Sequence, residues 1–218
     1  MNLSRNANRL VWLAMAGLIA WLAYGFRDQL AFLMTGTLTV TEQGEDADTV
    51  RLRWDGPVEA PMAARFREAI AEWRGRKRRF IVDLSSPGGS VDHGGAVIRQ
   101  LRDLRRTHEV ETVVGAGERC LSMCVPIYLA GTTRTASPRS RWMFHEVRIR
   151  DVLSDKDLDV PDHVRIRSTD QLFNDYFKPA GVSASWIAVT RHAMRQGDVW
   201  RTGQALFNEK AGVIQRLR

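Results

Sequence analysis

Short apolar strands that alternate with helical segments constrain the fold of this chain more than any other feature of its sequence. The clearest unit runs from the mostly apolar strand Phe80–Leu84, through the turn-forming loop Ser85–Ser90, into a helical pattern from Val91 to about Arg106. The next apolar run, Val110–Val114, has the length and composition of another strand. Such alternation predicts an α/β fold whose mainly parallel sheet lies between helices.

The remaining elements extend this order in both directions. Strands are predicted at Thr37–Thr41, Val50–Trp54, Arg141–Phe144, the edge Asp198–Trp200 and near Val213, and helices from Pro61, over Leu121–Ala130, 169–178 and 184–195, and from Thr202. Residues 147–168 are charged and irregular, which is typical of a surface loop. A length of 218 residues suits one domain with a short appendage, so we predict a domain over 37–218 and a separate segment over 1–36.

The N-terminal segment is predicted to be a transmembrane anchor. Leu10–Phe26 contains no charged residue, and Arg5 and Arg9 precede it. A cleavable signal peptide, the alternative, needs small residues just after the apolar run, where this chain has the bulky Trp21 and Tyr24. Positive charge before a membrane segment keeps the N-terminus in the cytoplasm. We therefore expect a single-pass protein of the cell inner membrane, with its domain in the periplasm if the source is Gram-negative.

Cys120 and Cys124 are the only cysteines, and they lie on either side of Ser122. In an oxidising periplasm free thiols tend to form disulfides, whereas in a reducing cytosol the pair would be two small buried residues. We expect the disulfide, which would close a very small loop and fix the backbone around Ser122. The histidines show no ligand spacing, so no metal and no other cofactor is predicted.

The net charge of +7 does not by itself indicate a nucleic-acid partner. The only dense basic cluster, Arg74 and residues 76–79, has no aromatic residues between its charges and no accompanying reading motif. Cations at this place suit the C-terminal end of the helix that begins at Pro61. We therefore predict a solvated helix end and no nucleic-acid partner.

Two strand-to-helix junctions carry candidate functional residues. In Ser86–Ser90 two glycines let the backbone turn tightly and expose N–H groups that can hold an anion or an oxyanion. Ser122 stands at the next junction, near the positive end of a helix dipole. Taken alone, the Ser86–Ser90 loop is interpreted as an ordinary turn and Ser122 as a helix cap. Both follow the carboxyl ends of strands, where α/β sheets place their sites, and their order and spacing together favour a functional site.

An ordered set of motifs resembles the Clp protease proteolytic subunit and, more broadly, the Clp/crotonase superfamily with its signal peptide peptidase A branch. The set consists of Ser86–Val91 followed by Gly94, Ser122–Met123, and Met143–His145. The likeness runs over residues 55–146 and implies repeated ββα units with a mainly parallel sheet, here preceded by one N-terminal transmembrane helix. It is closest to membrane-anchored or periplasmic Clp-like proteins in which Cys-x-Ser-x-Cys surrounds the serine.

The resemblance implies acyl transfer to a serine. Ser122 would attack a peptide carbonyl, and His145 would take its proton and return it to the leaving amine. The unperturbed pKa of histidine, about 6.5, suits that role. Backbone N–H groups of Gly89 and Met123 would stabilise the oxyanion. A purely structural His145 at a strand end is the alternative.

The chain departs from the family at the third catalytic residue. The family usually has an aspartate late in the chain, where this sequence has Thr190–Asp198 with no carboxylate at the expected place. Asp198 is the nearest candidate, although it starts the predicted edge strand. Asp170 or Asp175 as the orienting acid, a Ser–His dyad and an inactive site all stay open.

Two functions from different classes compete. The first is an extracytoplasmic, membrane-anchored serine peptidase that hydrolyses peptide bonds through a Ser122–His145 centre; the second is a weak or inactive module that binds peptides or proteins. An acyl-CoA enzyme of crotonase type is disfavoured, because CoA is cytosolic. The resemblance implies a homo-oligomer, and the helices at 169–195 occupy the place of the family's inter-subunit handle. No ATPase partner is expected, because the periplasm has no ATP pool.

Overall fold

The computed structural model describes residues 15, 17, 21, 36–42, 48–148 and 158–218. The predicted anchor Leu10–Phe26 lies outside these residues except at three positions. Among the residues described, no helix has both the length and the apolar character that a membrane crossing requires.

Six strands form the main sheet, and all but one of its strand pairs are parallel. The strands are β1 (Thr37–Glu42), β2 (Thr49–Asp55), β3 (Arg79–Ser85), β4 (Glu109–Val114), β6 (Thr133–Ala136) and β9 (Arg216–Leu217). Their spatial order is β1-β2-β3-β4-β6-β9, and only the β1–β2 pair is antiparallel. The predicted α/β architecture with a mainly parallel sheet is therefore confirmed.

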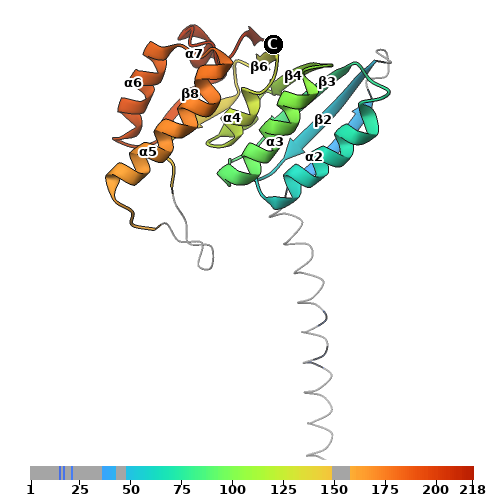
Figure 1. Cartoon of the computed structure of the whole chain (residues 1–218), viewed down its shortest axis with the longest axis horizontal. Helices are drawn as coiled ribbons and strands as arrows, with labels where there is room; N and C mark the ends of the chain where they lie inside the picture. The colour runs from blue at the N-terminus through green and yellow to red at the C-terminus, as the bar shows by residue number, and fades with distance from the viewer. Residues whose placement is uncertain (1–14, 16, 18–20, 22–35, 43–47, 149–157) are drawn as a thin grey trace, which may run out of the picture.

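Two helices, α2 (Ala60–Trp73) and α3 (Val91–Leu104), lie side by side over β2 and β3 (Figure 1). Alternate residues of β2, among them Leu52 and Trp54, are fully buried. The ring of Trp54 contacts that of Phe66 of α2 at a centroid distance of 6.2 Å. The apolar core forms between the sheet and the helices, where the alternating buried residues of β2 meet the apolar face of α2.

A second, three-stranded sheet holds the elements around Ser122. It consists of β5 (Arg119–Leu121), β7 (Arg141–Phe144) and β8 (Val199–Thr202), with β5 parallel and β8 antiparallel to the central β7. The short helix α4 (Cys124–Tyr128) follows β5. Beyond β7, α5 (Asp162–Leu172) runs into a π-helical turn (Phe173–Phe177) and a 3₁₀ turn (Lys178–Ala180), and α6 (Ala184–Met194) and α7 (Gly203–Asn208) complete the fold.

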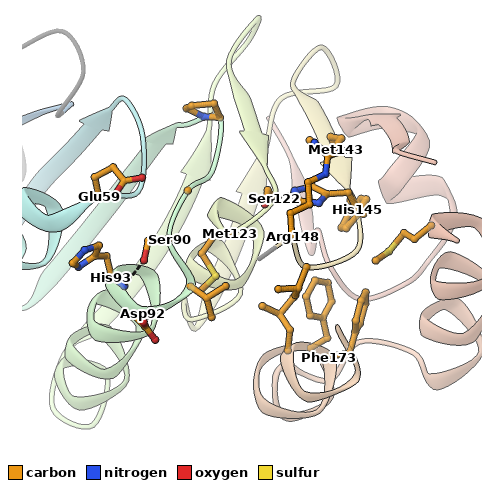
Figure 2. Close-up of a pocket in the computed structure, with 18 residues that line it drawn as sticks. Glu59, Ser90, Asp92, His93, Ser122, Met123, Met143, His145, Arg148 and Phe173 are labelled. Carbon is orange, nitrogen blue, oxygen red and sulfur yellow. Dashed lines mark hydrogen bonds between the residues drawn. The ribbon is translucent and has the colours of Figure 1, made fainter. Parts of the chain in front are cut away.

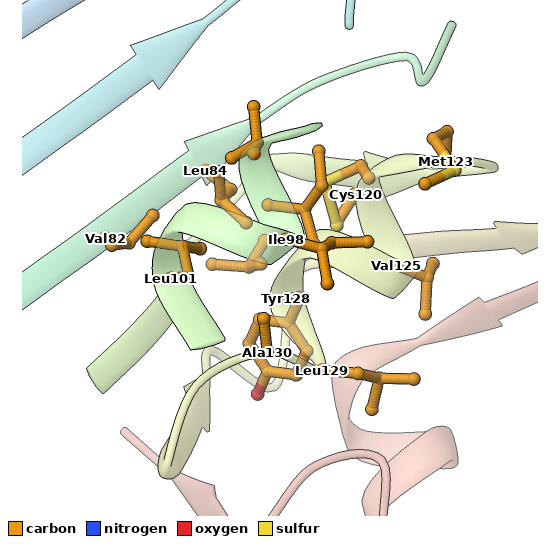
Figure 3. Close-up of a cluster of buried hydrophobic side chains, with 14 of the residues drawn as sticks. Val82, Leu84, Ile98, Leu101, Cys120, Met123, Val125, Tyr128, Leu129 and Ala130 are labelled. Carbon is orange, nitrogen blue, oxygen red and sulfur yellow. A yellow bond between two sulfur atoms is a disulfide. The ribbon is translucent and has the colours of Figure 1, made fainter. Parts of the chain in front are cut away.

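The apolar core reaches the underside of α4. Val82 and Leu84 of β3, Ile98 of α3 and Tyr128 of α4 gather around Cys120 (Figure 3), and each is at most 1% exposed. The turn that carries Ser122 therefore rests on a fully packed layer, and such a layer leaves little room for the backbone above it to shift.

The structure corrects several expectations about the elements. The helix predicted over Leu121–Ala130 is confined to Cys124–Tyr128, because Leu121 still belongs to β5 and donates its N–H to Ser86 O (3.0 Å). The helix predicted at 169–178 starts at Asp162, inside the stretch expected to be irregular, and an acidic first turn suits its dipole. Strand β6 is not among the predicted elements. The terminal strand predicted near Val213 lies at Arg216–Leu217, where it pairs with β6.

Candidate active site

The glycine loop after β3 lies directly against the turn that carries Ser122. Ser86 makes a parallel bridge to Cys120: its N–H donates to Arg119 O (2.7 Å), and its carbonyl accepts the N–H of Leu121 (3.0 Å). Its hydroxyl accepts the N–H of Gly88 at 3.1 Å, which tightens the turn. The two junctions that the sequence separates by more than thirty residues thus meet in one place.

Ser122 has a left-handed backbone conformation, with φ at +52°. Its N–H donates to Met143 O of β7 (2.9 Å), and its carbonyl accepts the N–H of Val125 (3.0 Å). A residue other than glycine rarely adopts a positive φ, and such strain concentrates at functional sites. The hydrogen bonds on both sides hold Ser122 in a sharp turn between β5 and α4.

His145 and Ser122 form a hydrogen-bonded pair. His145 Nε2 lies 2.8 Å from Ser122 Oγ, and Nδ1 lies 2.5 Å from the carbonyl oxygen of Glu146. A carbonyl oxygen can only accept, so Nδ1 carries the hydrogen in this arrangement. In the neutral ring Nε2 then presents its lone pair to Ser122, and this is the tautomer that can take a proton from the hydroxyl.

Two backbone amides near Ser122 have no acceptor among the described residues. Val58 pairs with the residues on either side of Gly89: it donates to Gly88 O (2.8 Å) and accepts from Ser90 N–H (2.9 Å). In a parallel bridge this pairing directs the N–H of Gly89 away from Val58. The N–H of Met123 belongs to the unsatisfied first turn of α4. Within the described part of the chain these two amides thus have no acceptor, and their role as oxyanion donors stays a prediction.

A cleft of about 680 Å³ opens over the pair (Figure 2). On its α5 side the lining is apolar and aromatic: Phe144, Leu172, Phe173, Phe177 and Met194. On its α3 side Glu59, Asp92 and His93 line the opposite end, with Ser122 and Met123 between the two ends. Clefts of this size with an apolar wall and few polar groups are typical ligand sites.

The π-helical turn places two phenylalanines in the apolar wall. Phe173 and Phe177 are almost fully buried, and their ring centroids lie 4.2 Å apart. Phe177 also contacts Phe144 of β7, at 6.4 Å. The spacing of two aromatic residues four positions apart is visible in the sequence, but nothing there indicates that they line the cleft.

A charged cluster supports the end of β3 from which the glycine loop begins. The pKa of Glu118 lies below its ordinary value, chiefly because the Ser85 hydroxyl donates to its carboxylate; burial acts in the opposite sense, and Arg53 adds a second hydrogen bond (2.7 Å). Hydrogen bonds to the charged form stabilise it. Ser85 is therefore tied to the neighbouring loop immediately before Ser86.

The two cysteines lie beneath Ser122 with their sulfur atoms at disulfide distance. The Sγ atoms are 2.01 Å apart, and both side chains are fully buried. The bond joins the middle residue of β5, Cys120 (Figure 3), to the first residue of α4, Cys124. The structure agrees with the predicted disulfide, and the closed loop contains the Ser122 turn.

The candidates for an orienting acid have other partners in the structure. The Asp198 carboxylate accepts a hydrogen bond from Arg148 at 3.0 Å, and Asp170 pairs with Arg191. Asp175 contributes its backbone carbonyl to a hydrogen bond from Arg102. The role of Asp198 as the third catalytic residue stays a prediction.

The sequence did not indicate which group contacts Nδ1 of His145. In the structure this contact is made by the main-chain carbonyl of Glu146. Because every residue has a carbonyl, no sequence motif distinguishes this one. The predicted pair Ser122–His145 and the predicted donors Gly89 and Met123 all border one cleft.

Comparison with known proteins identifies the family. The chain matches the Clp protease family over residues 55–195, about two thirds of its length. It is 30% identical over 123 residues to the ATP-dependent Clp protease proteolytic subunit 1 of Chlamydia abortus, a match that covers 55% of this chain and 60% of that relative. The chain belongs to the Clp protease family.

Solved structures share the fold at low sequence identity. The membrane-bound stomatin-specific protease 1510-N superposes with a TM-score of 0.59 at 12% identity, over 77% of both chains. A mutant of ClpP1 from Listeria monocytogenes gives 0.56 at 18%, over 79% of this chain and 92% of that one. A second 1510-N structure, in complex with a substrate peptide, gives 0.59 at 13%, over 77% of this chain and 73% of that one. At these identities the likeness establishes the fold alone.

Gly88 is predicted to be required for the position of Ser122. A Cβ added there would lie 2.6 Å from Ser122 Cβ, and φ is +89°. We expect Gly88→Ala to displace Ser122 and to abolish its labelling by a fluorophosphonate probe. Gly117→Ala is the matched control, because φ is +77° there but no atom lies within 4 Å of the added Cβ.

Both variants should lose stability by about 1–2 kcal/mol from the left-handed backbone, with a larger loss for Gly88→Ala because of the clash. Thermal melts compare the two losses. Equal labelling of both variants would show that the close approach is not needed.

The disulfide is predicted to be present in the native protein. Intact-mass analysis after alkylation should show no modified cysteine without prior reduction and two with it. We expect reduction to slow the labelling of Ser122, because the strained turn loses its covalent support. Two freely alkylated thiols in the unreduced protein would refute the bond.

Proposed function

We propose that this protein is a serine peptidase that hydrolyses peptide bonds through Ser122 and His145. The observation that carries the proposal is the 2.8 Å contact between Ser122 Oγ and His145 Nε2, combined with a ring whose other nitrogen donates to a carbonyl. This combination supplies a nucleophile and a base in the correct tautomer. Membership of the Clp protease family supports the same reaction class.

The reaction follows from the geometry. His145 Nε2 accepts the proton of Ser122 Oγ as that oxygen attacks the substrate carbonyl carbon, and the resulting imidazolium returns the proton to the leaving amine. Water then hydrolyses the acyl-enzyme by the same route. The half-buried position of both side chains keeps them accessible to a substrate in the cleft.

The amides of Gly89 and Met123 are proposed to bind the oxyanion. Each has no acceptor in the described part of the chain, and each belongs to backbone that neighbouring hydrogen bonds hold in place. A donor that is already oriented needs no reorganisation as charge develops, and in other hydrolases one such donor contributes about 3–4 kcal/mol.

The substrate is proposed to be a peptide or protein segment with a large apolar side chain next to the scissile bond. The cleft offers apolar surface in the half-buried side chains of Leu172 and Met143, with the buried rings of Phe173 and Phe177 in the same wall. Burial of an apolar side chain against it contributes about 1.5–3 kcal/mol. That one relative is solved with a substrate peptide is consistent with a peptide ligand.

We also propose that Leu10–Phe26 anchors the protein in the inner membrane with the peptidase domain in the periplasm, as a homo-oligomer that works without an ATPase. The uncharged run after Arg5 and Arg9 supports the anchor and its orientation. The cysteine pair at disulfide distance is consistent with an oxidising compartment.

The orientation can be tested with a reporter that is active only in the periplasm. A fusion after Arg218 of the full chain should be active, and a fusion to a chain that lacks residues 1–36 should be inactive. Activity of a cytoplasm-only reporter at the same position would refute the proposed orientation.

The peptidase proposal predicts covalent labelling of Ser122 by a fluorophosphonate. The wild-type chain should take up the probe, Ser122→Ala should not, and His145→Ala should react at least about 10²-fold more slowly, because general-base assistance contributes ~10²–10⁴-fold. Intact-mass analysis over time measures the rate. Ser90→Ala is the control for a serine that lines the same cleft and should keep full labelling.

The same assay separates the remaining alternatives. A fall of ~10⁴ in Asp198→Ala would assign Asp198 the orienting role, and a change within several-fold would favour an arrangement without it. Failure of the folded wild-type chain to react, or equal reaction of Ser122→Ala, would leave the peptide-binding module as the better description.

A further inference from the structure

A single peptide unit, between Glu146 and Val147, is held from both sides. Its carbonyl oxygen lies 2.5 Å from His145 Nδ1, and its N–H donates to Thr169 Oγ1 at 2.9 Å. Because a peptide unit is planar and its trans C=O and N–H point in opposite directions, the two contacts fix one rigid body. A continuous chain of hydrogen bonds therefore runs from Thr169 through this peptide and the imidazole to Ser122.

Thr169 is well placed to hold this peptide. It lies in α5, and only 3% of its surface is exposed. Water therefore competes little for the hydroxyl, and a buried polar group without its partner would be costly. The helix fixes the Thr169 backbone, so the hydroxyl offers an acceptor at a defined position.

Two ion pairs restrain residues at or near the same peptide, Glu146 and Arg148. Arg165 of α5 donates to the Glu146 carboxylate at 2.7 Å, and Arg148 donates to Asp198, just before β8, at 3.0 Å. These pairs are partly exposed and individually weak. Because one partner lies in α5 and the other lies just before β8, the two pairs nevertheless restrict the position of the segment that follows β7.

We propose that the Glu146–Val147 peptide orients His145 through its contact with Nδ1, and that Thr169 is the positioning residue that fixes this peptide. This inference rests on the proposed peptidase function. The carbonyl holds the proton on Nδ1 and so keeps Nε2 free for Ser122. The Thr169 hydrogen bond polarises the peptide, which increases the negative charge on the carbonyl oxygen when the imidazolium forms.

The test compares three variants of the full chain. Thr169→Val keeps the shape and removes the acceptor, and it should slow fluorophosphonate labelling between about tenfold and about a hundredfold, since a misplacement of about 1 Å can cost ~10²-fold. Thr169→Ser restores the hydroxyl and should return the rate to within a few-fold of wild type. Thr169→Ala removes the same acceptor and replaces Thr169→Val in the comparison if the valine variant does not fold.

Thr135→Val is the matched control for loss of a buried threonine hydrogen bond. Thr135 is 4% exposed and donates to Glu111 at 2.7 Å, in the main sheet. It should lose a comparable amount of stability in thermal melts and label at the wild-type rate. A general loosening of the fold would instead slow both variants.

A second readout is independent of activity. In the ¹⁵N spectrum of the histidine side chains, His145 Nδ1 should have the shift of a protonated nitrogen in wild type and move toward the unprotonated value in Thr169→Val. Labelling of Thr169→Val at the wild-type rate, or an unchanged imidazole spectrum, would overturn the inference. If wild type takes no label, the peptidase proposal fails, and the imidazole spectrum alone decides whether Thr169 orients His145.

Discussion

The arrangement of the cleft depends on how closely the glycine loop approaches the Ser122 turn. A Cβ on Gly88 would lie 2.6 Å from Ser122 Cβ and 2.7 Å from the carbonyl oxygen of Leu121, so only glycine allows the two backbones to meet. The approach brings the Gly89 amide to the same cleft as the Met123 amide. Without this approach, Ser122 and the amides of Gly89 and Met123 would not border one cleft.

Met123 extends this constraint to the helix that follows the loop. An added Cβ on Gly94 would lie 2.5 Å from Met123 Cγ, so the Met123 side chain packs directly on the α3 backbone. Met123, which borders the cleft, is thereby held against α3, the helix that follows the glycine loop. The β3–α3 junction and the β5–α4 junction thus support each other. The buried Cys120–Cys124 pair restrains the β5–α4 junction further.

Local sequence signals predicted most of the fold and brought attention to residues that border one cleft. The period-two pattern of β2 and the loop at Ser86–Ser90 are local, and such patterns specify strands, turns and their order. Ser122 and His145 were predictable because their motifs occur in the family's order. Helix α5 was placed too late, because its first turns carry few apolar residues and its start at Asp162 is stabilised by polar contacts.

The sequence could not indicate the contacts on the Nδ1 side of His145. The Glu146 carbonyl has no side-chain signature, and its acceptor role depends on where β7 ends relative to α5. The contact of Thr169 was likewise not predictable, because the hydroxyl of a buried threonine in a helix more often bonds to a carbonyl of its own helix. Only tertiary contact brings the Val147 N–H to its hydroxyl.

A peptide and a carboxylate do not orient a histidine equally well. A carboxylate brings a full negative charge to the imidazolium, whereas a peptide carbonyl brings only part of one, so its Coulombic attraction to the imidazolium is weaker. A site that relies on the Glu146–Val147 peptide therefore stabilises its transition state less through His145. More of the stabilisation then falls to the amides of Gly89 and Met123, whose positions depend on the approach of Gly88 to Ser122. The rigidity of the two junctions, which holds these amides in place, then matters as much as the contact at Nδ1.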